Sequence, residues 1–475
     1  MRLNYFKDIF NHQTRTIDSA VFVLAITSLT SAILGFFRDR LLAGRFGAGD
    51  ELDIYYAAFR IPDFISTVLI IGAIAAAITP VFSRSLVRSR QEAFEFLSNL
   101  LNVFLFFLII ICVLLIVFAP QILPLITPGF PKEKLELTVL LTRIMFLSPI
   151  LLGISNIISA ILRVFRRFVV TSFSPIMYNL GIISGILFFV PKFGLQGLAW
   201  GVVLGGFLHL FIQIPTLFNI GFKLGKIFNL KHQGLKEVIK LTIPRSVGLA
   251  ATQINLIVVT NIASSLVSGS IAVFNLAESL SRPLFTFIAN SYSTAAFTAL
   301  SLAFSKCDKE NFNKMYSLTF NRIIFLLLPL SFLLFVFRDL VVKIILQVGK
   351  FGLVNSSLTA TCLGMFCLGI FAQGLNNFIA KAFYALHDTK TPAMASIASM
   401  VVNVIFCLSF VRLLSFSNFF RQFFVDFLNL RDITGIEVIA LPLAISLSAV
   451  FQFFILFALF QKKIHGHHSS TTQPS

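Results

Sequence analysis

The stretch AAAITPVFSRSLVRSRQEAFEFLSNLLN, residues 75–102, has a weak counterpart about 220 residues later in AAFTALSLAFSKCDKENFNKMYSLTFN, residues 295–321. Each segment has an alanine-rich helix end, Phe-Ser-Arg or Phe-Ser-Lys, a charged loop, and then Phe or Tyr with Asn. Pro62 and Pro283 are separated by a similar interval. This self-similarity predicts that the chain consists of two related halves.

The composition is that of an integral membrane protein. Of all residues 57% are hydrophobic and only 12% are charged, whereas a soluble domain has about 25% charged residues. A helix that crosses a bilayer needs about 20 apolar residues, and the apolar runs do not alternate with polar residues as barrel strands would. We therefore predict an all-α bundle of about twelve transmembrane helices, at 19–38, 64–82, 95–118, 137–160, 169–190, 196–217, 243–265, 271–300, 317–337, 355–379, 391–412 and 437–460.

The number of runs predicts how the halves are related. Six crossings per half return the chain to the side on which it began, so both halves should have the same orientation. A pseudo-two-fold axis along the membrane normal, as in some transporters, would then relate them. We predict an N-terminal six-helix lobe, a basic cytoplasmic linker, a C-terminal six-helix lobe and a disordered tail, at 1–221, 222–241, 242–461 and 462–475.

Basic residues gather in the loops that follow the even-numbered runs, and the net charge is +18. The positive-inside rule makes these loops and both termini cytoplasmic. A nucleic-acid-binding protein would gather its charges on one soluble face, so no nucleic acid partner is expected. The N-terminus has no short apolar stretch with a small-residue cleavage site, and the first run is expected to be an uncleaved anchor.

Ionisable residues inside a bilayer are costly and usually face a bundle interior or an aqueous cavity. Arginine binds phosphate bidentately and apolar walls suit a lipid tail, so a cavity between the lobes would fit an anionic amphiphile. For Arg38, Arg40 and Arg45 the alternative is a position at the membrane surface. The candidate substrate-binding residues are Arg38, Asp39, Asp53, Arg60, Glu278 and Arg282, and Asp63 and Arg245 are further charges of the same kind.

Other polar residues leave two interpretations open. Arg143 and Arg322 could be cavity charges, or they could pair or reach the head groups. His209 could relay protons or be a hydrogen-bonded structural residue. The five cysteines are assigned to packing, and no metal site is expected. No H-E-x-x-H, G-x-S-x-G or P-loop pattern occurs, so an enzyme is not expected.

The stretch LGFFRDRLLAGRFGAGDELDIYYAAFRIP, residues 34–62, resembles the first signature of the MurJ (MviN) lipid II flippases, which belong to the multidrug/oligosaccharidyl-lipid/polysaccharide exporter superfamily. Further similar segments follow in the same order along nearly the whole chain. They are ITPGF at 126–130, ILRVFRRFVVTSFSPIMYN at 161–179, LAWGVVLGGFLHLFIQIP at 198–215, ATQINLIVVTNIASSLVSGS at 251–270, QVGKF at 347–351 and YALHDTKTP at 384–392.

The resemblance implies a monomeric flippase with a MATE-like fold in the bacterial cytoplasmic membrane. Its cargo would be the undecaprenyl-diphosphate-linked peptidoglycan precursor, moved by alternating access with no cofactor; the coupling ion, or coupling to the membrane potential, is left open. Arg38 and Asp39 match the Arg-Asp pair of the family, and Asp53 matches its acidic residue at the start of helix 2.

The chain also departs from the family pattern. Ala32, Ser66, Thr67 and Ser279 stand where the family usually has arginine, and Ile71 where it has glutamate. We expect twelve helices, without counterparts of the family's usual helices 13 and 14, which form a groove for the lipid tail. Two alternatives therefore remain: export of another polyprenyl-linked glycan or of a drug, and a non-transporting membrane scaffold with the same fold.

Overall fold

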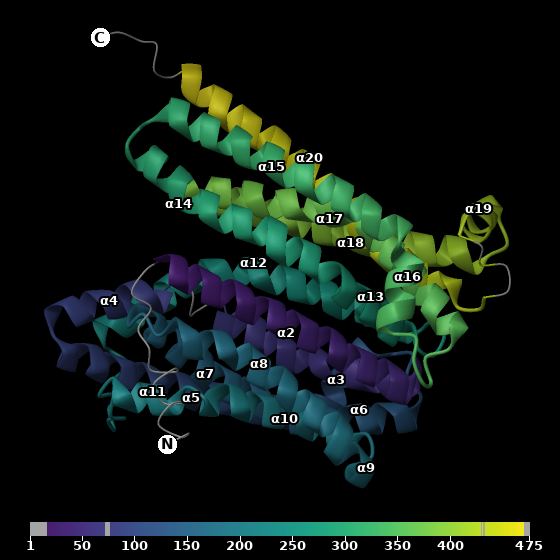
Figure 1. The fold of residues 1–475 in the computed structure, drawn as a ribbon, viewed down its shortest axis with the longest axis horizontal. Coiled ribbons are helices and arrows are strands. Elements are labelled where there is room, and N and C mark those ends of the chain that lie inside the picture. The colour runs from purple at the N-terminus through teal and green to yellow at the C-terminus, as the bar shows by residue number, and fades with distance from the viewer. Residues whose placement is uncertain (1–16, 72–76, 429, 431–432, 470–475) are drawn as a thin grey trace. The chain divides into compact units, whose positions relative to one another are not determined.

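The computed structural model describes residues 17–71, 77–428, 430 and 433–469, with the side chains of 17–22, 69–71, 244–245 and 465–469 left out of the description. The described residues form helices joined by short loops (Figure 1). They divide into two compact units, one of residues 1–42 and 50–254 and the other of residues 43–49 and 255–475. The division after Ile254 falls inside α12 (Gln233–Ser264), and the predicted lobes and linker stay predictions.

The first unit contains most of α2 and the helices up to the first part of α12. In this unit α10 contacts both α7 and α8, and α3 contacts α6 (Figure 1). Its elements are α2 (Ile17–Phe46), α3 (Asp50–Ile65), η1 (Ser66–Ile71), α4 (Thr79–Arg88), α5 (Arg90–Ile126), α6 (Lys132–Met145), α7 (Leu147–Val164), α8 (Phe168–Ser184), η3 (Gly185–Phe189), α9 (Val190–Phe193), α10 (Gln196–Phe211), α11 (Ile214–Asn219) and the start of α12 (Gln233–Ser264).

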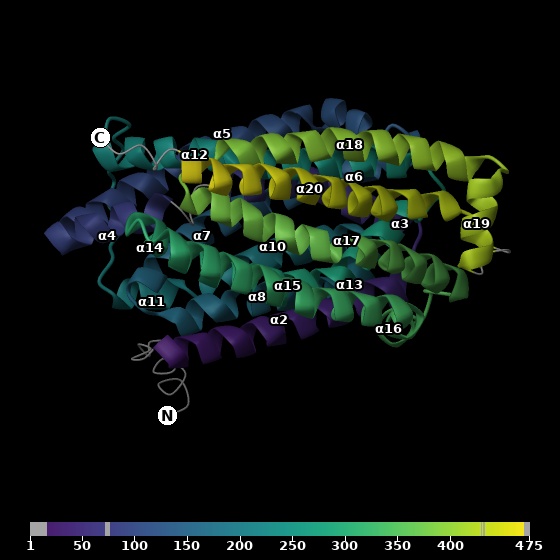
Figure 2. The same ribbon diagram turned by 90° about the horizontal axis from the view of Figure 1, so that it is seen from above.

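The second unit is built around α17, the most buried of its spans, which packs against α13, α15 and α20 (Figure 2). The short helix α19 follows α18 directly. The elements after α12 are α13 (Ser270–Leu284), η4 (Phe285–Asn290), α14 (Ser291–Ser305), α15 (Lys309–Val336), α16 (Arg338–Ile345), α17 (Leu353–Ala385), α18 (Lys390–Ser415), α19 (Phe419–Phe427), η5 (Ile436–Ile439) and α20 (Ala440–Ser469).

Nine helices within the described residues are long and apolar enough to cross a membrane. They match nine of the twelve predicted runs, which confirms the all-helical membrane class. The other three runs, at 19–38, 64–82 and 271–300, fall in α2, in α3 to α4 and in α13 to α14, except that residues 72–76 lie outside the described residues. These runs stay predictions as complete spans.

The two units share an unusual backbone feature. A proline lies inside α3 and inside α13, and each helix continues as a π-helix, η1 or η4. Proline removes the N–H that a regular helix would use, and π-turns are a way for a helix to absorb such a break. The two π-helices follow Pro62 and Pro283, the pair that the sequence repeat singles out.

Glycines allow two helices of the first unit to approach closely. A Cβ atom added to Gly181 in α8 would lie 2.2 Å from the Cα atom of Gly205 in α10, and one added to Gly185 would lie 2.4 Å from Cα of Gly201. Small residues permit such contact between membrane helices, where van der Waals packing drives association.

We expect Gly181→Ala and Gly185→Ala to destabilise the protein by about 1–3 kcal/mol, because the new methyl group overlaps backbone atoms that cannot turn away. Gly248→Ala is the matched control, since nothing lies within 4 Å of its added Cβ. The thermal midpoint of the purified protein measures the effect. Unchanged midpoints in both variants would contradict the close packing of α8 on α10.

An ion pair joins the loop after α17 to the end of α20. Lys463 donates to Asp388, and Thr391 donates to the same carboxylate through its backbone N–H and its hydroxyl group. Burial raises the pKa of Asp388, but these hydrogen bonds outweigh burial and lower the pKa to about 2.

A carboxyl group with a lowered pKa stabilises the folded state above its ordinary pKa, near 4, and this contribution is lost as the pH falls toward 2. The thermal midpoint of Asp388→Asn should therefore lie below that of the parent at pH 6, and the difference should shrink between pH 4 and pH 3. A difference that stays constant over this range would show that the carboxylate charge is not what stabilises the loop.

Candidate functional site

Arg38 is held in one orientation by two neighbours in the first unit. Its Nε and Nη2 atoms donate to Oδ1 of Asp39 at 3.0 and 2.8 Å, and Nη1 donates to Oδ1 of Asn179 in α8 at 3.2 Å. Asn179 in turn donates to the hydroxyl group of Ser31 at 3.2 Å. The Asp39 side chain is 2% exposed and that of Arg38 is 25% exposed, so the carboxylate is buried while the guanidinium group is partly accessible.

A guanidinium group has five N–H donors, and the hydrogen bonds to Asp39 and Asn179 use three of them. Tyr55 and Tyr56 of α3 lie within electrostatic reach of the same group. Tyr55, Tyr56 and Asn179 are not among the predicted site residues, although the sequence offered a signal for them: the tyrosines follow Asp53 closely, and Asn179 is the last residue of a segment that resembles the family.

Asp53 forms a second buried ion pair rather than joining Arg38. The Lys134 ammonium group of α6 lies 3.0 Å from Asp53 and 2.6 Å from Asp50, and its side chain is 9% exposed. The same ammonium group lies 4.0 Å from the ring centroid of Phe130. These contacts fix the first turn of α3 against α6. Nothing in the sequence predicts this role of Lys134, except that the residue lies just after a segment that resembles the family, ITPGF at 126–130.

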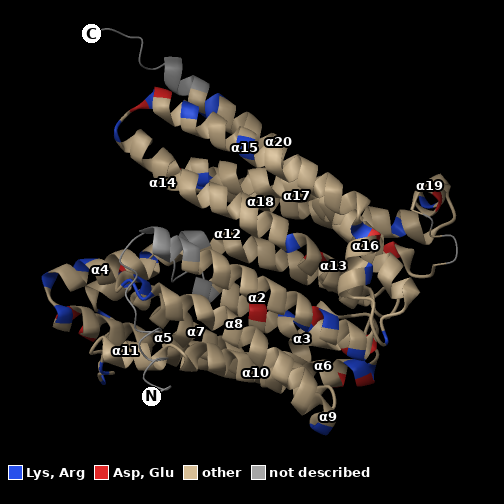
Figure 3. Cartoon of the chain, in the orientation of Figure 1, with Lys and Arg blue, Asp and Glu red and all other residues tan. Residues whose placement is uncertain are grey.

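Arg60 is buried in α3, two residues before Pro62, and Asp63 is half-buried in the same helix. In the second unit, Arg282 donates to Glu278 at 3.0 Å across one turn of α13, as their spacing predicts. The Arg282 side chain is 64% exposed. The side chain of Arg245 lies outside the described residues. Figure 3 shows that charged residues gather mainly near the helix ends in each unit.

Arg143 has a structural partner. Its Nε atom donates at 3.1 Å to the carbonyl oxygen of Ile116 in α5. In a regular helix this carbonyl group would accept the N–H of residue 120, which here is a proline and has none. An unsatisfied carbonyl group in hydrocarbon costs several kcal/mol, so Arg143 replaces the missing donor.

His209 also has structural partners. Its Nδ1 atom lies 2.7 Å from the Ser155 hydroxyl group, which accepts a hydrogen bond from Gln213 at 2.7 Å, and Ser159 donates to Gln213 at 2.8 Å. The network is buried between α7 and the C-terminal end of α10. These contacts support the interpretation of His209 as a hydrogen-bonded structural residue.

A double-mutant cycle tests the role of Arg143. Arg143→Met should lower the thermal midpoint in a Pro120 background, because the Ile116 carbonyl group loses its donor. In a Pro120→Ala background, where residue 120 supplies an N–H, the same substitution should cost much less. The expected coupling is about 1–3 kcal/mol. Equal effects of Arg143→Met in both backgrounds would contradict the proposed replacement.

The chain is similar to proteins of one family along most of its length. The family model described as lipid II flippase MurJ matches residues 42–473. A probable lipid II flippase MurJ of Buchnera aphidicola subsp. Acyrthosiphon pisum is 32% identical over 385 residues, which cover 80% of this chain and 75% of the relative. The lipid II flippase MurJ of Burkholderia cenocepacia is 26% identical over 396 residues, 82% of this chain and 77% of that protein.

Solved structures show the same fold. The lipid II flippase MurJ in an inward closed conformation has a TM-score of 0.75 at 23% identity and covers 96% of this chain and 94% of its own. An inward-facing multidrug resistance MATE family transporter has a TM-score of 0.74 at 15% identity, covering 95% and 100%. The fold is therefore MATE-like, as predicted, and the family is one of multi-pass membrane transporters rather than enzymes. The chain belongs to the lipid II flippase MurJ family.

Proposed function

We propose that this protein carries lipid II, the undecaprenyl-diphosphate-linked peptidoglycan precursor, from the inner to the outer leaflet of the bacterial cytoplasmic membrane by alternating access. The family supports the cargo, and the observation that supports the binding mode is the geometry of Arg38. Its guanidinium group is oriented by Asp39 and Asn179 and keeps N–H donors beyond those that these partners use.

A diphosphate is a suitable ligand for such a group. Guanidinium binds phosphate oxygens through two parallel N–H donors and stays charged at any working pH. Asp39 neutralises Arg38 when no anion is bound, which reduces the cost of keeping the charge inside the membrane. Binding of the diphosphate through the remaining donors adds a second anionic partner to the guanidinium group, and the fixed orientation of Arg38 lowers the entropic cost of binding.

In this proposal some of the other predicted residues contact the diphosphate and some act only by orienting other residues. Arg60 and Arg282 provide further positive charge for the diphosphate, and Glu278 orients Arg282 through their ion pair. Asp53 contributes through Lys134, since their ion pair fixes the start of the helix that carries Tyr55, Tyr56 and Arg60. The proposal keeps a monomer of two six-helix lobes with both termini in the cytoplasm, as the basic loops indicate.

Substitution of Arg38 tests the binding mode. Arg38→Ala should slow translocation of labelled lipid II in liposomes by at least about tenfold, the value of one charge-assisted hydrogen bond. The translocation rate of Arg38→Lys should lie between those of the alanine variant and the parent, because the positive charge remains while the bidentate contact is lost. Arg84→Ala is the matched control, since Arg84 also pairs with a carboxylate, Glu237, but on an exposed surface.

A folded Arg38→Ala protein that moves lipid II at the parental rate would refute the proposed contact. A parent that moves a different undecaprenyl-diphosphate-linked glycan as fast as lipid II would favour the broader glycan exporter. A parent that moves neither cargo under any imposed ion gradient would favour the scaffold.

A further inference from the structure

The chain that follows α11 contacts the first turns of α5 through a segment without regular secondary structure. We call residues 221–230 the strap. Asn102 of α5 donates to the carbonyl oxygens of Gly225 and Ile227 at 2.8 and 2.9 Å, and the N–H of Gly225 donates to the Ser98 hydroxyl group at 3.0 Å. Asn99 exchanges two hydrogen bonds with the backbone of Asn229, at 2.9 and 2.6 Å.

Three polar side chains thus hold the strap to a helix that is otherwise among the most apolar in the chain, with a mean hydropathy of 3.4 in its most apolar window. The backbone of the strap is thereby satisfied at the edge of the hydrocarbon region, where water is scarce. The strap is a fixed part of the first unit and not a loose loop.

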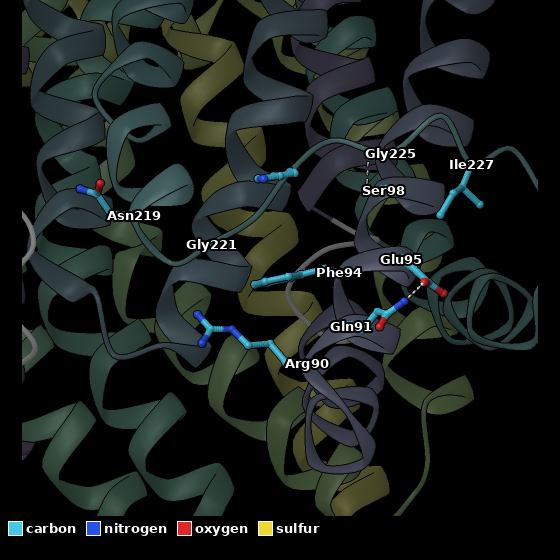
Figure 4. Close-up of a pocket in the computed structure, with 10 residues that line it drawn as sticks. Arg90, Gln91, Phe94, Glu95, Ser98, Asn219, Gly221, Gly225 and Ile227 are labelled. Carbon is cyan, nitrogen blue, oxygen red and sulfur yellow. Dashed lines mark hydrogen bonds between the residues drawn. The ribbon is translucent and has the colours of Figure 1, made fainter.

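A cavity of about 510 Å³ lies between the strap, the end of α11 and the first turns of α5 (Figure 4). Figure 4 shows Phe94 and Arg90 of α5 on one side and the strap glycines on the other. The residues that line it are Arg90, Gln91, Phe94, Glu95, Ser98, Asn219, Gly221, Lys223, Gly225 and Ile227.

The cavity carries a net positive charge. The Arg90 guanidinium group donates to the carbonyl oxygen of Ile220 and lies 5.5 Å from the ring centroid of Phe94. Lys223 is exposed and forms no ion pair or hydrogen bond with any other residue in the described part of the chain. The one carboxylate among the lining residues, Glu95, accepts a hydrogen bond from Gln91 at 3.0 Å.

The exposed face of α5 continues from this cavity into the hydrocarbon region. Counting on from Ser98 in steps of three or four residues, the same face presents Phe106, Ile109, Val113 and Val117, all exposed. Phe106 packs against Phe228 of the strap, with ring centroids 5.4 Å apart. A basic cavity therefore lies directly above a continuous apolar face, which is the arrangement that a phospholipid needs.

We propose that this cavity binds the phosphodiester head group of an anionic phospholipid, whose acyl chains lie along the exposed face of α5. Lys223 and Arg90 contact the phosphate, and the strap glycines let the head group approach the backbone. Basic pockets at the cytoplasmic ends of membrane helices bind anionic head groups in this way. The site lies within the first unit and does not use the residues proposed to bind the transported cargo.

Occupation of this site would add contacts between the strap and α5 and so further stabilise the start of the linker that leads to α12. The experiment uses the purified full-length protein in a neutral detergent, with the thermal midpoint measured as phosphatidylglycerol, phosphatidylcholine or inorganic phosphate is added. Phosphatidylglycerol should raise the midpoint with a saturable dependence, and the other two additions should raise it far less.

Lys223→Glu should weaken the apparent affinity for phosphatidylglycerol by about tenfold, and Arg90→Gln should weaken it as well. Lys226→Glu is the matched control, because it makes the same change of charge on the same strap at a residue that does not line the cavity. Since Lys223 has no structural partner within the described residues, its variant should fold as the parent does, and its midpoint without lipid checks this.

Equal weakening by Lys226→Glu and Lys223→Glu would overturn the proposal in favour of general surface attraction. An equal response to inorganic phosphate would show an anion site without a lipid. Lipid II translocation by Lys223→Glu is measured in parallel in neutral liposomes, where it should match the parent, so that failure of this proposal and failure of the flippase proposal give different results.

Discussion

The structure depends on one constraint: inside hydrocarbon every backbone N–H and C=O group needs a partner within the protein. Each proline inside a helix leaves one backbone carbonyl group without its usual N–H donor. In α3, α5 and α13 this loss is compensated by a local contact or by a local change of helix geometry. α3 and α13 continue as π-helices after Pro62 and Pro283. In α5 a side chain from another helix, Arg143, supplies the donor that Pro120 lacks. The Thr142 hydroxyl group lies 3.3 Å from the carbonyl oxygen of Ala58, the group that Pro62 frees in α3.

Thr142 and Arg143, which are adjacent in α6, therefore contact backbone carbonyl groups of α3 and α5, respectively. This explains why a polar helix segment with modest hydropathy can belong to a membrane protein: its charged and hydroxyl groups compensate defects in its neighbours. The same helix carries Lys134, which pairs with Asp53 and Asp50 at the start of α3. α6 is thus an organising element of the first unit, and the proposed cargo site on α2 and α3 rests partly on it.

Much of the architecture could be predicted from the sequence, because a bilayer imposes length and composition on each span. In the part of the chain that the structure describes, nine of the twelve expected runs are apolar helices of sufficient length, and π-helices follow both Pro62 and Pro283, the two prolines of the repeat. The pair of Glu278 and Arg282 followed from helical spacing alone. The distant partners could not be predicted, because no periodic pattern marks them: Asn179 for Arg38, Lys134 for Asp53 and the Ile116 carbonyl group for Arg143.

The sequence by itself determined the membrane class, the position of most helices and the family, since these depend on local hydrophobicity and on residues read in order. Tertiary structure decided which partners each charge has and how far it is exposed. Asp53 pairs with Lys134, Arg143 donates to a backbone carbonyl group, and Arg38 combines protein partners with partial exposure. The physical reason is that the cost of a charge in a membrane depends on its neighbours in space, and helix packing, rather than chain order, chooses those neighbours.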